Sequence, residues 1–210
     1  SEILYNYMKG QTMTDFYDVM TLRRSNYSLD DRVELSEPQI MELINHAVKQ
    51  CPSAFNSQSA RVIVLFNEHQ QKFWNLTLKE LEKVTPKDKF AKTEKKIASF
   101  AAARGTILFF EDEDVIKGLQ NNFPLYKDKF PVWSEQGNAI LQYAVWCLLA
   151  DNGIGASLQH YSPLVDSFVH KEWQAPENWK LIAQMPFGRI TGEPGPKDYL
   201  PLETRVKIFS

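Results

Sequence analysis

The chain has 210 residues, of which 43% are hydrophobic, and it carries a formal net charge of −2. That length and apolar content are enough to bury one sizeable core, so we expect a single domain. The near-neutral charge provides no dominant basic face, which argues against a nucleic-acid partner. No apolar run approaches the roughly 20 residues that a membrane-spanning helix needs, so we expect no membrane partner.

The two cysteines, Cys51 and Cys147, lack CxxC spacing and form no His/Cys cluster. We therefore expect neither a disulfide nor a metal site, and this usage fits a reducing cytoplasm. For Cys51, a buried and inert thiol is the expected state. Residues 1–11 lack a signal-peptide core. We interpret 1–13 as an extra or flexible segment before one domain that spans 14–210.

Apolar residues recur at helical spacing or in short runs along most of the chain. The helical spacing predicts helices at 14–22, 36–51, about 69–84, 87–103, 133–150 and 164–170. Apolar runs predict buried strands at 61–66, 106–110 and 180–187, with a short strand or turn at 155–158. Strands that alternate with helices indicate an α/β or α+β sandwich.

Local signals mark several helix ends. Thr14 could cap the first helix, and Ser36 with Gln39 forms a capping-box pattern at the second. The pair Asn152-Gly153 predicts a left-handed stop after the long apolar helix.

Two charged runs stand out along the chain, one within a predicted helix and one directly after a predicted strand. We expect the lysine-rich stretch 87–96 and the acidic run 111–114 to be solvated faces. The tail 203–209 alternates loosely and could pair with a sheet.

Two polar segments in the first third of the chain have the composition of a ligand site. Arg23-Arg24-Ser25 offers two forked guanidinium groups and a hydroxyl to a phosphate, although such a pair could equally complement the dipole of the preceding helix. The segment 52–61 reads Pro-Ser-Ala-Phe-Asn-Ser-Gln-Ser-Ala-Arg and places hydroxyls and amides between a helix and a strand. Ser53 and Asn56 could hydrogen-bond the edge of a flat heteroaromatic ring. An ordinary turn-rich loop would have the same composition.

Two later segments could complete such a site. The stretch 153–161 reads Gly-Ile-Gly-Ala-Ser-Leu-Gln-His-Tyr, and its small residues let the backbone approach a ligand closely. It is not the GxGxxG dinucleotide fingerprint, because a helix rather than a strand precedes it. Lys197 could add positive charge at a phosphate. Alternatively, the stretch 153–161 is a loop with a structural histidine, and Lys197 is a solvated surface residue.

In this order and spacing, the four segments resemble the FMN-dependent nitroreductase family. The family pattern Arg-x-Ser-x-Arg/Lys is matched by Arg23 and Ser25, with Tyr27 where a basic residue is usual. The pattern Pro-Ser-x-x-Asn-x-Gln is matched in full by Pro52, Ser53, Asn56 and Gln58. The amino-acid sequences of 53–61 and 157–161 are similar to those of the short "fatty acid repression mutant" subgroup. The chain departs from many nitroreductases in lacking a Glu-Gly pair at 157–161 and in carrying Tyr199 where the late Lys-x-Arg motif places arginine.

The resemblance implies an α+β fold, a three-layer α/β/α sandwich with a central, mostly antiparallel sheet and an intertwined homodimer that binds FMN at its interface. The implied cofactor-binding residues are Arg23, Arg24, Ser25, Tyr27, Ser53, Ala54, Phe55, Asn56, Gln58, Leu158, Gln159, His160, Lys197 and Tyr199. The arginines, Ser25 and Lys197 of one subunit would hold the phosphate and the pyrimidine edge, and 53–56 would come from the other. Backbone N–H groups near 158–160 would orient flavin N5.

The resemblance also implies hydride transfer from NAD(P)H to FMN and then to a nitroaromatic or quinone-like acceptor, in a ping-pong sequence. Because the flavin carries the chemistry, we expect no catalytic protein residue. Phe123, Tyr126 and Phe130, followed by Trp133, form either a substrate-side lid or plain core packing. Two alternatives stay open: a flavin-binding redox sensor or regulator in lipid or stress response, and a different enzyme on this scaffold, such as a reductive dehalogenase.

Overall fold

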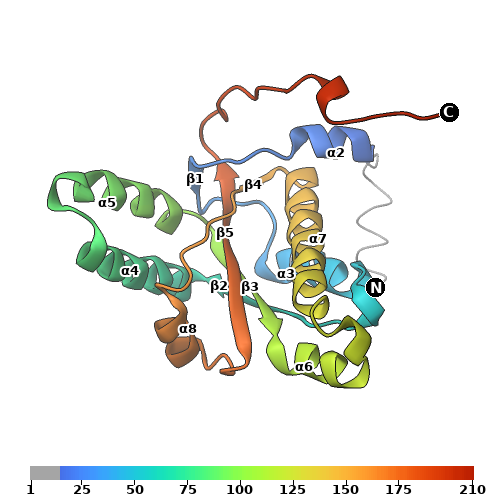
Figure 1. Cartoon of the computed structure of the whole chain (residues 1–210). Coiled ribbons are helices and arrows are strands. Elements are labelled where there is room, and N and C mark those ends of the chain that lie inside the picture. Colours follow the sequence, from blue (N-terminus) through green and yellow to red (C-terminus); the bar gives the residue numbers. More distant parts are fainter. Residues whose placement is uncertain (1–14) are drawn as a thin grey trace.

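The described residues, 15–210 of a computed structural model, form three layers, with a central sheet between two groups of helices (Figure 1). The interpreted extra segment 1–13 lies outside the described residues. All strand pairs of the sheet are antiparallel. The expected α+β sandwich is therefore confirmed.

The strands follow the order β1-β5-β3-β2, and β4 pairs with β5 beyond this path. Their bounds are β1 Leu29–Asp30, β2 Ala60–Phe66, β3 Gly105–Asp112, β4 Ile154–Ala156 and β5 Trp179–Ile190. The three long strands confirm the three apolar runs and extend each of them. The short β1 was not expected, because two residues leave no readable alternation.

Within residues 15–210, all six expected helices are present, together with a seventh that the sequence did not indicate. Their bounds are α2 Phe16–Leu22, α3 Glu37–Gln50, α4 Asn67–Val84, α5 Lys87–Ala101, α6 Glu113–Asn122, α7 Phe130–Asp151 and α8 Asp166–Trp173. Single 3-10 turns lie at η1 Ala54–Asn56, η2 Pro124–Tyr126 and η3 Leu202–Thr204. The unexpected helix, α6, begins inside the acidic run.

The helix ends follow the local signals closely. The capping box between Ser36 and Gln39 is present at α3. Gly153 has φ of 70° and ends α7 in the left-handed region. The cap expected at Thr14 is wrong, because Asp15 caps α2 by accepting the N–H of Tyr17 at 3.1 Å.

Alternating residues of β3 supply both hydrophobic cores. Ile107 and Phe109 pack with α3 and α7, while Leu108 and Phe110 pack with α4, α5 and α8 on the opposite face (Figure 1). All four are completely buried. A strand covered on both faces needs apolar residues at every position, which is why the run 106–110 lacks polar alternation. Each such side chain contributes about 1.5–3 kcal/mol by leaving water.

The expectation that the whole acidic run faces water is wrong, and the C-terminal tail pairs with no strand of the described chain. Glu111 and Asp112 of the acidic run are buried, with only 2% and 8% of their surface exposed. They are the last two residues of β3, and there α7 and the segment before β2 still cover the strand. The tail 203–209 does not join the sheet of its own chain, because the chain leaves β5 as an irregular arm and closes a 3-10 turn at η3 (Figure 1).

We predict that Gly188→Ala destabilises the fold by about 1–3 kcal/mol. A side-chain carbon on Gly188 would clash with the carbonyl of Asp30, so β1 could no longer pair with β5. The matched control is Gly118→Ala in α6, where an added carbon meets nothing within 4 Å. That change should stabilise the protein by about 0.5–1 kcal/mol. Urea unfolding measures both, and equal effects would contradict the close-approach argument.

Candidate functional site

Arg23, Arg24 and Ser25, here called the arginine cluster, are fixed by the end of α2 and by the sheet. Arg23 caps the C-terminus of α2, donating its N–H to the carbonyl of Val19 at 2.9 Å. Ser25 then forms an isolated parallel bridge with Ala156 of β4. The cluster therefore sits on a rigid edge of the fold and not on a free loop.

Three buried polar atoms without a hydrogen-bond partner lie around this cluster. They are Arg23 Nε, Asn26 Oδ1 and Trp146 Nε1. The Arg23 guanidinium stacks on the Trp146 ring of α7, 4.4 Å from its centroid. A buried polar group without a partner costs about 1–3 kcal/mol, so several at one place indicate that a polar ligand belongs there.

The cluster also holds positive charge that no carboxylate neutralises. Arg24 donates to the carbonyl of Gly195 at 2.5 Å, which ties the C-terminal arm to the cluster. Lys197 on that arm lies 5.1 Å from the ring centroid of Tyr199. Within residues 15–210, neither arginine of the cluster nor Lys197 forms an ion pair with a carboxylate, whereas Arg32, Arg61, Arg104 and Arg189 each do. The arrangement suits an anion.

The segment after β4 contributes less backbone than the sequence implied. The N–H of Gln159 donates to the carbonyl of Gln184 at 2.7 Å, and its carbonyl accepts the N–H of Gln184 at 2.9 Å. The N–H and the carbonyl of Gln159 are therefore both used by the sheet, which corrects the expectation for one of the three donors near 158–160. Leu158 packs against a core and His160 is exposed.

The Pro52–Ser59 loop lies elsewhere, against the first half of α7. It is held internally by Ser53 Oγ, which accepts the N–H of Gln58 at 2.9 Å. Phe55, Asn56 and Gln58 have φ of 57°, 50° and 50°. Non-glycine residues in this left-handed region cost of order 1–3 kcal/mol each and persist where surrounding contacts hold them.

Phe55 at the tip of the loop gathers an aromatic cluster. Its ring centroid lies 4.9 Å from Phe123, 5.3 Å from Phe130, 6.1 Å from Tyr126 and 6.2 Å from Trp133. Phe130 is 2% exposed and belongs to the packed interior, while Phe123 and Tyr126 are each 41% exposed. Phe130 therefore fits the alternative of core packing, whereas Phe123 and Tyr126 face solvent beside the loop, where a substrate-side lid would lie.

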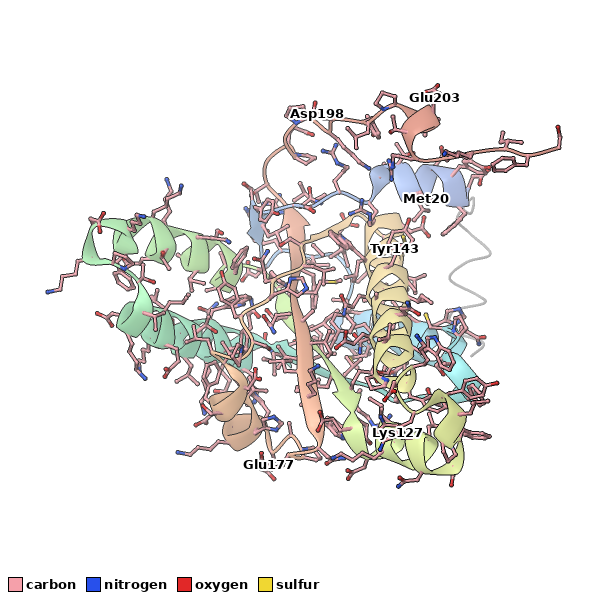
Figure 2. The ribbon with its side chains drawn as sticks, in the orientation of Figure 1. Met20, Lys127, Tyr143, Glu177, Asp198 and Glu203 are labelled. Carbon is pink, nitrogen blue, oxygen red and sulfur yellow. The ribbon has the colours of Figure 1, made fainter. Side chains whose placement is uncertain are left out.

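α7 keeps the loop and the arginine cluster apart. Ser53 lies against Gly137, where an added side-chain carbon would be 3.8 Å away, and Arg23 stacks on Trp146, nine residues later. Nine helical residues correspond to about 14 Å along the axis and to opposite sides of the helix. Figure 2 shows Met20 and Tyr143 towards one end of α7 and Lys127 at the other. One chain does not bring its own two halves together.

The sequence reasoning missed the polar residues that support both halves. Asn26 is 5% exposed and directly follows the predicted motif, and its N–H donates to the carbonyl of Ala156 at 2.9 Å. Trp146 lies in the apolar pattern of α7, which gives no sign of a polar role. The thiols of Cys51 and Cys147 are both free, and burial raises the pKa of each. Cys51 is only partly buried, so the expectation of a buried thiol at that position is met in part, and its inertness stays a prediction.

A model described as "Nitroreductase family" matches residues 20–189. The chain belongs to the Nitroreductase family. Two curated proteins of Saccharomyces cerevisiae are similar to it along nearly their whole length. HBN1 is 29% identical over 93% of this chain and 97% of its own, and nitroreductase FRM2 is 25% identical over 89% and 93%. FRM2 is the fatty acid repression mutant protein, so the subgroup resemblance is confirmed.

Solved nitroreductases share the fold. The nitroreductase CinD from Lactococcus lactis, in complex with chloramphenicol, is 43% identical, covers 93% of this chain with 100% of its own, and has a TM-score of 0.86. A nitroreductase with bound FMN from Desulfitobacterium hafniense has a TM-score of 0.69 at 17% identity, over 95% and 100% of the two chains. Family membership makes this chain an oxidoreductase of the nitroreductase kind.

Residues 15–210 contain neither a metal-binding cluster nor a membrane-spanning helix. No group of three or more His, Cys, Asp or Glu side chains there is placed to hold a metal ion. Among the same residues, no helix combines the length and the apolar character needed to cross a membrane.

Proposed function

We propose that this nitroreductase binds FMN and passes hydride from NAD(P)H to nitroaromatic or quinone-like acceptors by a ping-pong mechanism. The observation that carries the proposal is the set of unpaired cations, Arg23, Arg24 and Lys197, beside buried polar atoms that lack partners. A dianionic phosphate joined to a polar heterocycle matches that demand. The FMN in the solved D. hafniense nitroreductase supports the choice of flavin.

The residues present fit FMN in two groups. Arg23, Arg24, Ser25 and Lys197 would hold the phosphate and the pyrimidine edge. Tyr27 and Tyr199, both more than half exposed, stand where the family commonly has basic residues. They replace charge with hydroxyl groups at the edge of the site. The N5 contact would come from the backbone N–H of Leu158 or His160, since the N–H of Gln159 is used by the sheet.

The second group would come from another copy of the chain. Ser53, Ala54, Phe55, Asn56 and Gln58 are too far from their own arginine cluster, on the opposite side of α7. α7 carries exposed apolar residues on the outer face between the two halves, namely Val132, Ile140 and Tyr143. α2 adds Phe16, Tyr17 and Met20. A two-fold homodimer that buries these side chains would complete two identical sites.

When bound, FMN would supply the redox chemistry for hydride transfer between NAD(P)H and the acceptor. The cations of the arginine cluster stabilise the negative charge that a reduced flavin carries. Phe55, Phe123 and Tyr126 offer exposed ring faces on which a nicotinamide or a nitroaromatic ring can stack. CinD, 43% identical, has been solved with chloramphenicol and with 4-nitrophenol, both nitroaromatics, which supports this acceptor class.

We further propose that residues 14–210 form a single FMN-binding domain and that the protein works in the cytoplasm. The family match over 20–189 supports the first statement. The two free thiols fit a reducing compartment.

The first test is cofactor content. Purified protein should be yellow and should release FMN on denaturation. Replacing both Arg24 and Lys197 by alanine should weaken FMN binding by about 2–4 kcal/mol, because charge-assisted hydrogen bonds contribute roughly 1.5–3 kcal/mol each and exposed charges are partly screened. Arg205→Ala, which removes an exposed arginine from the same arm, is the control. Fluorescence titration of the flavin-free protein measures this, and equal affinity in all variants would refute the phosphate assignment.

A mixed-dimer experiment tests the split site. Arg23→Ala and Asn56→Ala should each lower flavin occupancy when every subunit carries the change. In a refolded 1:1 mixture, half of the dimers combine the two variants, and each has one intact site. About a quarter of all sites should then bind FMN tightly. Occupancy no higher than in the separate variants would place both residues in one subunit's site.

Turnover separates an enzyme from a redox sensor. FMN-loaded protein should oxidise NADH or NADPH in the presence of 4-nitrophenol or a quinone, with the parallel double-reciprocal plots of a ping-pong sequence. The expected readout is acceptor-dependent loss of absorbance from the reduced nicotinamide. Flavin-loaded protein without acceptor-dependent turnover would contradict the enzyme and favour the sensor.

A further inference from the structure

The Pro52–Ser59 loop is held in an unfavourable shape over open space. Three of its residues have left-handed φ, and it lines a cavity of about 510 Å³ between α3, β2 and α7. Pro52, Ser53, Gln58 and Ser59 all border that cavity. Contacts of Phe55 with the aromatic cluster hold the tip of this strained loop, and hydrogen bonds to rigid elements can hold it on the side that faces the cavity.

Glu111 provides such a fixed point at the end of β3. It is 2% exposed, and its Oε2 accepts the hydroxyl of Ser59 at 2.6 Å. Its Oε1 accepts the side-chain amide of Asn138 on α7 at 2.8 Å. Asn138 also donates to the carbonyl of Phe110 at 3.0 Å, and its Oδ1 accepts the amide of Gln142 at 2.7 Å. A continuous buried network thus joins the loop, the central strand and α7.

Burying the charged carboxyl of Glu111 costs free energy, because it removes the charge from water. Burial raises the pKa of Glu111, against the opposing effects of its hydrogen bonds to Ser59 and Asn138 and of the Arg61 charge. Asp112 raises the pKa further, although Arg61 pairs with Asp112 at 2.8 Å. Apolar residues of similar volume often serve stability at least as well as a buried charge. A reason other than stability is therefore needed for a carboxyl at this position.

We propose that Glu111 is a positioning residue, whose two oxygens tie Ser59 of the Pro52–Ser59 loop to Asn138 of α7 and so hold Ser53 and Asn56 in the geometry that FMN requires. The step to FMN rests on the proposed function. Arg61 supports the same end of the loop by donating to the carbonyl of Gln58 at 2.7 Å. A carboxylate suits the task because it accepts on both oxygens at once, in a fixed plane.

The test compares Glu111→Ala and Glu111→Gln with a matched control. The control, Thr106→Val, breaks another buried hydrogen-bond network on the same strand, in which Thr106 accepts from Trp74 at 2.9 Å and donates to Gln70 at 2.5 Å. It lies in the opposite core, away from the loop. Amide hydrogen exchange of peptides covering 53–59 in flavin-free protein gives a readout that needs neither activity nor cofactor. FMN affinity is measured separately by fluorescence titration.

Glu111→Ala should speed exchange in 53–59 and weaken FMN binding by about 10-fold or more, since two buried hydrogen bonds are lost. Glu111→Gln should stay within about threefold of the native protein, because the amide keeps one acceptor oxygen for Asn138 and can donate to the Ser59 hydroxyl. Thr106→Val should lower the melting temperature without either effect. Rescue by glutamine together with an unaffected control would support the tether.

Two outcomes would overturn the inference. In the first, Glu111→Ala and Thr106→Val exchange equally fast in 53–59, so that any destabilisation loosens the loop. In the second, Glu111→Ala loosens the loop while FMN affinity stays unchanged. Failure of the native protein to bind FMN would instead remove the proposed function, and the exchange measurement would still decide whether Glu111 holds the loop.

Discussion

The geometry of α7 constrains the rest of the site. The helix carries the Pro52–Ser59 loop on one side at Gly137 and the arginine cluster on the other at Trp146. Because α7 is a helix of 22 residues and these two positions lie on its opposite sides, the loop and the arginine cluster of one chain cannot meet. Donors suited to a ring edge and cations suited to a phosphate are therefore presented to opposite sides of one element. Because of this separation, a complete site needs a second copy of the chain. The exposed apolar residues of α7 and α2 form a surface that this copy can bury.

The central strand β3 imposes a second constraint, which explains where polar groups occur in the interior. Its middle positions face two cores and are all apolar. Polar side chains appear towards its ends, as Thr106 on one core and Glu111 beneath the loop. Both are fully hydrogen-bonded, as burial requires. At Glu111 and Asp112, therefore, β3 no longer packs with apolar core residues and instead forms hydrogen bonds with the segment at the end of the loop.

How much could be predicted depends on whether the signal is local. Helical spacing and capping patterns lie within a few neighbouring residues, so the ends of α3 and α7 were found at Ser36 and Gly153. The arginine cluster and the loop are contiguous motifs, so the sequence alone also predicts them as candidate site segments, and their role stays a prediction. Glu111 was missed because a run of four acidic residues ordinarily faces water, and its partners Ser59 and Asn138 are distant in sequence. Asn26 and Trp146 were missed for a related reason, since an orphaned buried atom exists only after folding.

The distribution of ion pairs supports the anion site more strongly than the arginine motif alone. The chain has 26 acidic and 24 basic residues, so carboxylates are not scarce. Arg32 and Arg189 share Asp30, Arg61 pairs with Asp112, and Arg104 pairs with Glu37. Arginines that fix the sheet and the loop are thus neutralised within the chain. Among the described residues 15–210, Arg24 of the cluster donates to the carbonyl of Gly195 and Arg23 stacks on an indole ring, and neither pairs with a carboxylate. Unneutralised cations held close together repel one another, and an anionic ligand removes that repulsion when it binds. The same ligand would stabilise the folded state by mass action, which offsets the strain that its own loop introduces.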